Sequence, residues 1–236
     1  MKIIFLIFTT FNLLFANINL DIQKTSLFDV TSQNAKINIA NLKLGQSGVI
    51  IKDIDTNSII LSQAKVIETT DTYSEIEFLE NDVLPQDAIP TSNYKPQDKD
   101  TFILNHLYNT SLLIVPNLEA KKIVQKLYPQ QNFLNEDYFA AHLKVENTPL
   151  PQKEDIANFT QSQQIGTVFF VIAETLYIVD SLSFKIIDTV EITNNDTTTN
   201  SPFFTKIEDI KRGFWNFGPE KIENYNRYYS ELLEIR

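Results

Sequence analysis

Apolar and polar residues alternate in short runs along the first half of the chain. In Ala35–Leu42, for example, Ile37 and Ile39 alternate with Lys36 and Asn38, which is the period of a half-buried strand. The strand-like runs are Ala35–Leu42, Val49–Ile54, Ser58–Leu61, Ala64–Glu68 and Tyr73–Leu79. Short strands separated by turns predict a small antiparallel sheet or barrel-like unit over about residues 35–104, after a polar and irregular start.

Beyond Thr101 the period changes, and strand-like runs are mixed with helical spacing. The predicted strands are Phe102–Leu104, Ser111–Val115, Gly166–Val171, Thr175–Val179 and Lys185–Ile192. The predicted helices are Leu118–Tyr128, a helix capped by Asn135, Lys153–Gln163 and a final helix from about Glu220 to Leu233. We therefore predict an α+β fold with a β-rich subdomain at residues 17–104, followed by a mixed α/β subdomain with a C-terminal helix at residues 105–236.

The most continuous apolar run, Ile3–Leu14, lies behind Lys2 and ahead of the small residue Ala16. A positive start, an apolar stretch and a small residue predict a signal peptide at residues 1–16, although Leu14 stands where a second small residue is preferred. The run is shorter than the roughly 20 residues of a bilayer span, so cleavage is favoured over a retained anchor or an N-terminal strand. The sequence thus predicts export, with no transmembrane span after cleavage.

Charge and cysteine content narrow the class of protein further. The chain has 30 acidic and 20 basic residues, a formal net charge of -10, which disfavours binding to nucleic acid. It contains no cysteine, which excludes disulfides, thiolate catalysis and a lipoprotein anchor. The 17 Phe and nine Tyr must instead supply packing. The pattern indicates an acidic, cysteine-free, exported globular protein.

No group of residues forms a convincing catalytic, cofactor or metal motif. Phosphate-binding glycine patterns do not occur in the sequence, and its two histidines are too few for a site built on several imidazoles. Ser47 stands in Gly45-Gln46-Ser47-Gly48, where a turn is the simpler interpretation than a nucleophile elbow. We therefore expect no enzyme activity, no cofactor and no metal. A cofactor-free hydrolase using a buried pair of acids stays open as an alternative.

Several short motifs together resemble the N-terminal domain of the bacterial plasminogen-binding surface protein family. They occur in order over about residues 37–233. The motifs are Gly45–Val49, Pro85–Pro90, Leu104–Asn109, Val115–Asn117, Asp137–Leu143, Val179–Phe184 and Tyr225–Leu233. The resemblance implies a cell-envelope protein of a Helicobacter- or Campylobacter-type bacterium, in the periplasm or associated with the outer membrane at the cell surface. It also implies a protein partner, which in the named members is host plasminogen.

The resemblance also implies a mode of binding. Plasminogen kringles hold an ammonium group and a carboxylate at the two ends of an aromatic-lined slot, and a C-terminal lysine fills that slot best. Longer members of the family carry a lysine-containing tail, whereas this sequence ends in Arg236, whose guanidinium is a poorer mimic. The candidate partner-binding residues are Arg236, Lys211, Arg212, Lys121 and Lys122.

Besides the hydrolase, one alternative to plasminogen capture stays open. It is a periplasmic or envelope structural or assembly factor that has an endogenous protein partner and no role with plasminogen. A separate question concerns the aromatic residues Phe214, Trp215 and Phe217 beside Lys211 and Arg212. They form either an exposed contact patch or, more simply, core packing beneath the last helix.

Overall fold

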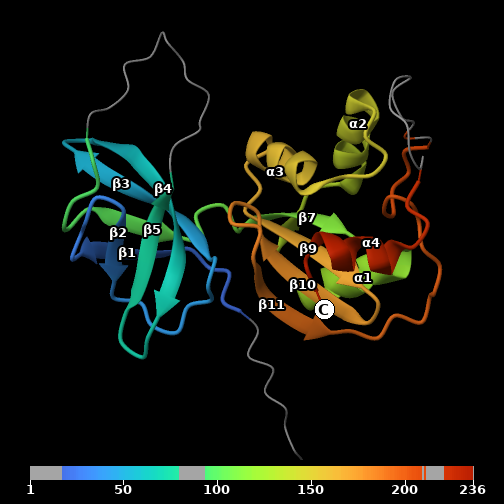
Figure 1. The fold of residues 1–236 in the computed structure, drawn as a ribbon, viewed down its shortest axis with the longest axis horizontal. Coiled ribbons are helices and arrows are strands. Elements are labelled where there is room, and N and C mark those ends of the chain that lie inside the picture. The colour runs from blue at the N-terminus through green and yellow to red at the C-terminus, as the bar shows by residue number, and fades with distance from the viewer. Residues whose placement is uncertain (1–17, 80–93, 209, 211–220, 236) are drawn as a thin grey trace, which may run out of the picture.

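The computed structural model describes residues 18–79, 94–208, 210 and 221–235. Two units lie side by side in this structure, a β-barrel and a mixed sheet carrying helices (Figure 1). The predicted α+β class, with an antiparallel β unit first and a mixed half with a C-terminal helix second, is confirmed. No helix in the described part of the chain is long and apolar enough to cross a membrane.

Six antiparallel strands close the barrel. They are β1 (Gln23–Phe28), β2 (Asn34–Ile37), β3 (Ser47–Ile54), β4 (Asn57–Thr69), β5 (Ser74–Leu79) and β6 (Thr101–Leu104). Their order is β1-β2-β5-β4-β3-β6, and β6 pairs with both β1 and β3. Closure satisfies the backbone groups that an open sheet would leave unpaired at its edges. Mainly aliphatic side chains, including Ile37, Ile50 and Ile76, fill the interior around Phe102.

Two expectations for the first half need correction. The predicted irregular start contains β1, in which Leu27 is the buried residue and the rest are half-buried or exposed. Its sequence gives little hydrophobic signal, because Leu27 is its one core residue and backbone pairing to β2 and β6 holds the rest of the strand. In addition, the runs predicted at residues 58–61 and 64–68 form the single strand β4, whose pairing shifts at bulges.

The second unit is built on a five-stranded sheet. Its strands are β7 (Thr110–Ile114), β8 (Asn132–Phe133), β9 (Thr167–Ile172), β10 (Thr175–Asp180) and β11 (Ile186–Glu191), in the order β11-β10-β9-β7-β8. The central strand β9 is buried along its whole length. Its continuous apolar sequence follows from this position, because helices cover both faces of the sheet.

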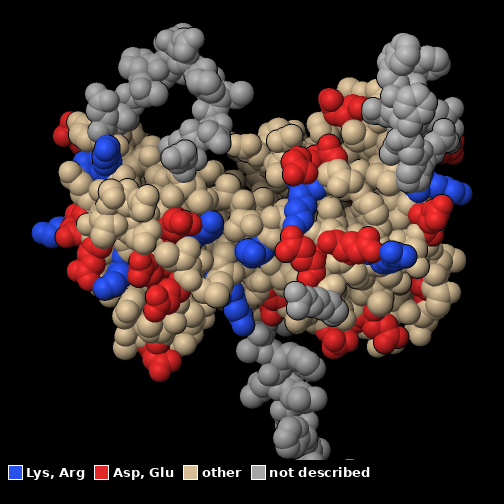
Figure 2. All heavy atoms as spheres, viewed as in Figure 1, with Lys and Arg blue, Asp and Glu red and all other residues tan. Residues whose placement is uncertain are grey.

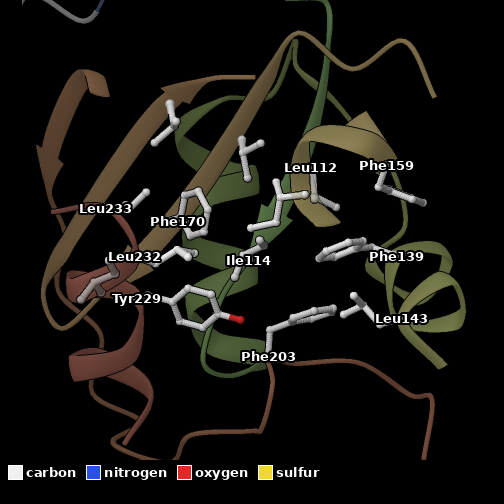
Figure 3. Close-up of a cluster of buried hydrophobic side chains, with 14 of the residues drawn as sticks. Leu112, Ile114, Phe139, Leu143, Phe159, Phe170, Phe203, Tyr229, Leu232 and Leu233 are labelled. Carbon is white, nitrogen blue, oxygen red and sulfur yellow. The ribbon is translucent and has the colours of Figure 1, made fainter. Parts of the chain in front are cut away.

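Alternate residues of the strands pack against helices on opposite faces of the sheet. Leu113, Phe169 and Val171 pack with α1 (Leu118–Leu127). Leu112, Ile114 and Phe170 face α2 (Glu136–Glu146), α3 (Lys153–Ser162) and α4 (Tyr225–Leu232). Figure 3 shows rings from these helices meeting in this second core, where Phe139 stacks on Phe203 with centroids 5.5 Å apart.

Asparagine side chains fix where three of the helices begin. The side-chain oxygens of Asn117, Asn135 and Asn224 accept hydrogen bonds from backbone N–H groups in the first turns of α1, α2 and α4. The final helix therefore begins at Tyr225, five residues later than the predicted Glu220. Ile222 lies before the cap and is buried in the aromatic core.

Candidate protein-binding surface

The structure separates the two neighbouring lysines predicted on α1. Both carboxylate oxygens of the buried Glu136 accept hydrogen bonds from the Lys121 ammonium, at 2.6 and 2.7 Å. Lys121 is therefore committed to a structural ion pair, whereas Lys122 beside it is exposed. The other candidates, Lys211, Arg212 and Arg236, lie outside the described residues, as do Phe214, Trp215 and Phe217.

Exposed charges gather instead on the face formed by α3 and α4. The Lys153 ammonium lies 2.5 Å from a Glu234 carboxylate oxygen, with the two side chains 38% and 74% exposed. Arg227 donates from Nε to Glu231 at 2.8 Å, one helical turn along α4. Figure 2 shows acidic and basic side chains lying side by side on this part of the surface. The pairs present cations and carboxylates together on a chain that is acidic overall.

A shallow depression of about 360 Å³ lies between the start of α3 and α4. It is lined by Gln152, Lys153, Glu154, Tyr228, Glu231 and Leu232. The Tyr228 hydroxyl donates to the Pro151 carbonyl at 3.0 Å and accepts from the Gln152 amide at 2.9 Å. Burial, with a smaller contribution from Asp155, raises the pKa of Tyr228 to about 12, so this hydroxyl stays neutral. The depression thus has a fixed aromatic ring beside charged groups of both signs.

The amphipathic pattern of α4 produces this arrangement. Tyr225, Tyr229 and Leu232 enter the core, which leaves Arg227 and Glu231 on the opposite, exposed side. At the start of α3, the Asp155 carboxylate accepts from the Gln152 backbone N–H at 2.7 Å and fixes the first turn. The hydrogen bond from Lys153, with its positive charge, lowers the pKa of Glu234. The surface therefore stays zwitterionic at neutral pH.

A second polar cluster lies buried between the barrel and the mixed sheet. Asp180, at the end of β10, is fully buried and accepts hydrogen bonds from the Ser47 hydroxyl at 2.5 Å and the Tyr108 hydroxyl at 2.7 Å. Its other oxygen accepts from the backbone N–H groups of Leu182 and Ser183. Burial raises the pKa of Asp180, and these hydrogen bonds offset part of that rise. We name this set the Asp180 junction.

The Asp180 junction explains why separate sequence motifs occur together. Gly45–Val49, Leu104–Asn109 and Val179–Phe184 carried the family resemblance, and all three meet here. Gly45 has φ +89°, and a Cβ on it would lie 2.5 Å from Cβ of Lys185, so glycine is needed. Ser47 donates to a carboxylate with no solvent access, which fits a structural role better than that of a nucleophile. The three motifs were the only sign of the Asp180 junction in the sequence, and their spacing along the chain did not show that they meet in the fold.

No set of three or more histidine, aspartate or glutamate side chains in the described part of the chain could hold a metal ion.

Comparisons with known proteins place the chain in a family. It is 24% identical over 197 residues to the plasminogen-binding protein PgbA from each of two Helicobacter pylori strains, J99 and 26695. Each match covers 82% of this chain but 43% of the relative, so the chain spans less than half the length of these proteins. No solved structure matches it. The family model described as plasminogen-binding protein pgbA N-terminal matches residues 22–233, and the chain belongs to this family.

Proposed function

We propose that this chain is an exported, non-catalytic domain of the cell envelope that binds plasminogen through the charged face of α3 and α4. Family membership supports a protein-binding role, and the names of the H. pylori relatives state the partner. The observation that carries the proposal is the exposed Lys153–Glu234 pair beside the α3–α4 depression. It presents an ammonium and a carboxylate on the same surface. The two groups have to separate before they can occupy the two ends of a kringle slot.

The neighbouring pair strengthens this choice of surface. Arg227 and Glu231 are 77% and 66% exposed, so both remain free to exchange partners when another protein approaches. Exposed ion pairs contribute at most about 1 kcal/mol to stability, so breaking one to bind a partner costs little. Lys121, in contrast, would have to leave a buried carboxylate uncompensated.

The test is a binding measurement with purified plasminogen and the mature chain, with and without a lysine analogue. We expect the analogue to abolish binding and the double variant K153Q/R227Q to weaken it about tenfold or more, about 1.4 kcal/mol. The matched control is K65Q, because Lys65 forms a partly exposed ion pair with Glu77 on the barrel. Binding that resists the analogue, or that K65Q weakens as much as K153Q/R227Q does, would contradict the proposal.

A second candidate function is that of an envelope assembly factor with an endogenous partner. It is favoured by the exposed face of α2, where Tyr138 and Val145 are 64% and 75% exposed. They are seven positions apart, about two helical turns, so they lie on one side of the helix. Protease treatment of intact cells distinguishes the candidates. Cleavage of this chain supports capture of a host protein, whereas full protection with cleavage after lysis supports the periplasmic role.

A further inference from the structure

The chain passes from the barrel to the mixed sheet through a short connection that begins at Asn105. Leu104 ends β6, and Thr110 begins β7. Asn105 is fully buried and has φ +59°, in the left-handed region that asparagine tolerates better than most residues. Hinge motions between parts of a protein are absorbed by a few residues in loops or at the ends of elements. Asn105 therefore stands where the barrel could turn relative to the sheet.

The backbone and side-chain oxygen of Asn105 are held by the barrel and by its own connection. The Asn105 N–H donates to the Ser47 carbonyl at 2.9 Å, and the Asn105 carbonyl accepts from the Tyr108 N–H at 3.0 Å. The side-chain oxygen accepts from the Gln46 amide at 3.3 Å. Ser47 and Tyr108 also donate to the buried carboxylate of Asp180. These contacts join the connection to the Asp180 junction.

The side-chain NH₂ group of Asn105 is held by a different segment, residues 18–21. It donates to the backbone carbonyls of Asn19 and Asp21 at 3.1 and 3.0 Å. An NH₂ group has two hydrogens, so both are used. We call residues 18–21 the N-terminal strap. The strap thus completes the set of hydrogen bonds that fixes the buried side chain of Asn105.

The N-terminal strap is anchored on the mixed sheet and leads into the barrel. Ile18 and Leu20 pack against the core on the α1 face of the sheet. The Ile18 backbone N–H donates to a carboxylate oxygen of Asp188, on β11, at 2.9 Å. The first strand of the barrel begins at Gln23, directly after the strap. The strap therefore ties the barrel to the sheet at a second place, apart from the connection that follows β6.

The anchors of the strap are light compared with those of the strands. Ile18 and Leu20 are half-buried, and Asn19 and Asp21 are exposed. A surface segment with few buried apolar contacts opens at a lower cost in free energy than core strands do. We propose that the N-terminal strap is a detachable clamp that holds Asn105 and so fixes the angle between the barrel and the mixed sheet.

Release of the clamp changes the connection and leaves the surface that we propose for plasminogen in place. Both hydrogens of the Asn105 amide lose their acceptors, and the barrel is then free to turn about residues 105–109. The Asp180 junction remains as the pivot of this movement. The strap lies on the α1 face of the sheet, whereas α3 and α4 cover the opposite face. The clamp is therefore a conformational device separate from the proposed binding site.

Distances between two spin labels on the full chain test the clamp. The sequence has no cysteine, so Thr56→Cys on the barrel and Glu146→Cys on α2, both exposed, can be labelled specifically. We expect one narrow distance distribution in the otherwise native chain. In Ile18→Ser/Leu20→Ser, which removes the apolar anchors, the distribution should become at least about twice as wide. The matched control is Ile22→Ser, which removes a 49% exposed side chain just beyond the strap and should leave the width unchanged.

A second variant, Asn105→Gly, tests the same clamp from the connection. Glycine keeps access to φ +59° but removes the amide that holds the strap, so we expect a similar widening. A native width in either variant would overturn the inference, as would equal widening in Ile22→Ser. Loss of the circular dichroism signal of the folded chain in either variant would also overturn it, because the altered residues would then hold the fold together and not act as a clamp. The measurement needs no plasminogen, so failure of the clamp is distinguishable from failure of the proposed function.

Discussion

The barrel and the mixed-sheet unit reach stability by different means. In the barrel, ring closure pairs the backbone of every strand, and a small, mainly aliphatic core suffices. In the mixed-sheet unit, both faces of the sheet must be covered, and rings from α2, α3, α4 and β9 meet on one of them. The barrel thus depends on pairing between strands, whereas the sheet unit depends on side chains brought together from distant segments.

The two units also differ in what they display. The charged face and the depression lie on α3 and α4, which the sheet unit needs in order to bury its aromatic core. The barrel contributes Ser47 to the Asp180 junction, which fixes it to the sheet. Under the proposed function, the helices of the sheet unit carry the recognition surface and the barrel supports that unit through the Asp180 junction.

Removing an aromatic ring from the core of either unit is expected to cause the largest loss of stability. Phe139→Ala, in the sheet unit, should lower the free energy of unfolding by about 3–5 kcal/mol because it leaves a cavity among Phe159 and Phe203. Phe102→Ala in the barrel should cost a similar amount. Because the Asp180 junction joins the units, urea unfolding followed by circular dichroism should show one transition in both variants. Two separated transitions would show that the units unfold independently.

Asp180→Asn tests the junction itself. The side-chain NH₂ group cannot accept the hydrogen bonds of Ser47 and Tyr108, so we expect a loss of about 2–4 kcal/mol. Buried asparagine also removes a titrating group. Burial raises the pKa of Asp180 above its unfolded value, so the stability that this group contributes is greatest below about pH 4. That stability is lost as the pH rises through the pKa of Asp180 in the folded protein.

The advantage of the native chain over Asp180→Asn should therefore shrink as the pH rises from 4 toward neutrality. Urea unfolding of both proteins across this range measures it. An advantage that grows with rising pH would show that hydrogen bonds to the carboxylate outweigh its burial, and would reverse the sign of the pKa change. The control is Asp55→Asn, because Asp55 is exposed. The difference in the free energy of unfolding between this variant and the native chain should not shrink in the same way as the pH rises.

Lys121→Met is expected to have an intermediate effect in the sheet unit. It leaves the Glu136 carboxylate, 4% exposed, without its cation, which should cost about 2–3 kcal/mol. The double variant Lys121→Met/Glu136→Gln should recover much of this loss because the uncompensated charge is gone. Lys122→Met is the control on the same helix and should change stability by less than about 0.5 kcal/mol. Equal losses for Lys121→Met and Lys122→Met would contradict the structural role of Lys121.

The sequence predicted the fold class because burial follows the backbone period in most elements. The continuous apolar run of β9 and the spacing of α1 and α4 are examples. It did not predict β1, which is held by pairing to strands far along the chain and carries little hydrophobic signal. Local patterns report burial, but they do not report which distant backbone will supply a partner.

The candidate surface was harder to predict for a related reason. Lys121 and Lys122 are adjacent and chemically identical, and only the fold shows that a buried Glu136 from α2 binds the first. Likewise, Lys153 and Glu234 are 81 residues apart, so no local motif could join them. The family resemblance marked the segments that form the Asp180 junction and also Tyr225–Leu233 on α4, yet it gave no indication that the charges of α4 lie beside α3.

Two variants that should change stability least test most directly which unit binds plasminogen. Lys153→Gln on the sheet unit and Lys65→Gln on the barrel each break an exposed ion pair, so each should change the free energy of unfolding by less than about 1 kcal/mol. Urea unfolding at low and moderate salt should show that both small effects decline with ionic strength. The two variants should then change the free energy of unfolding by similar amounts. A loss of plasminogen binding seen with Lys153→Gln and not with Lys65→Gln would therefore be due to the loss of the positive charge on the α3–α4 surface. If Lys153→Gln proves strongly destabilising, that charge belongs to the structure and the recognition surface must lie elsewhere.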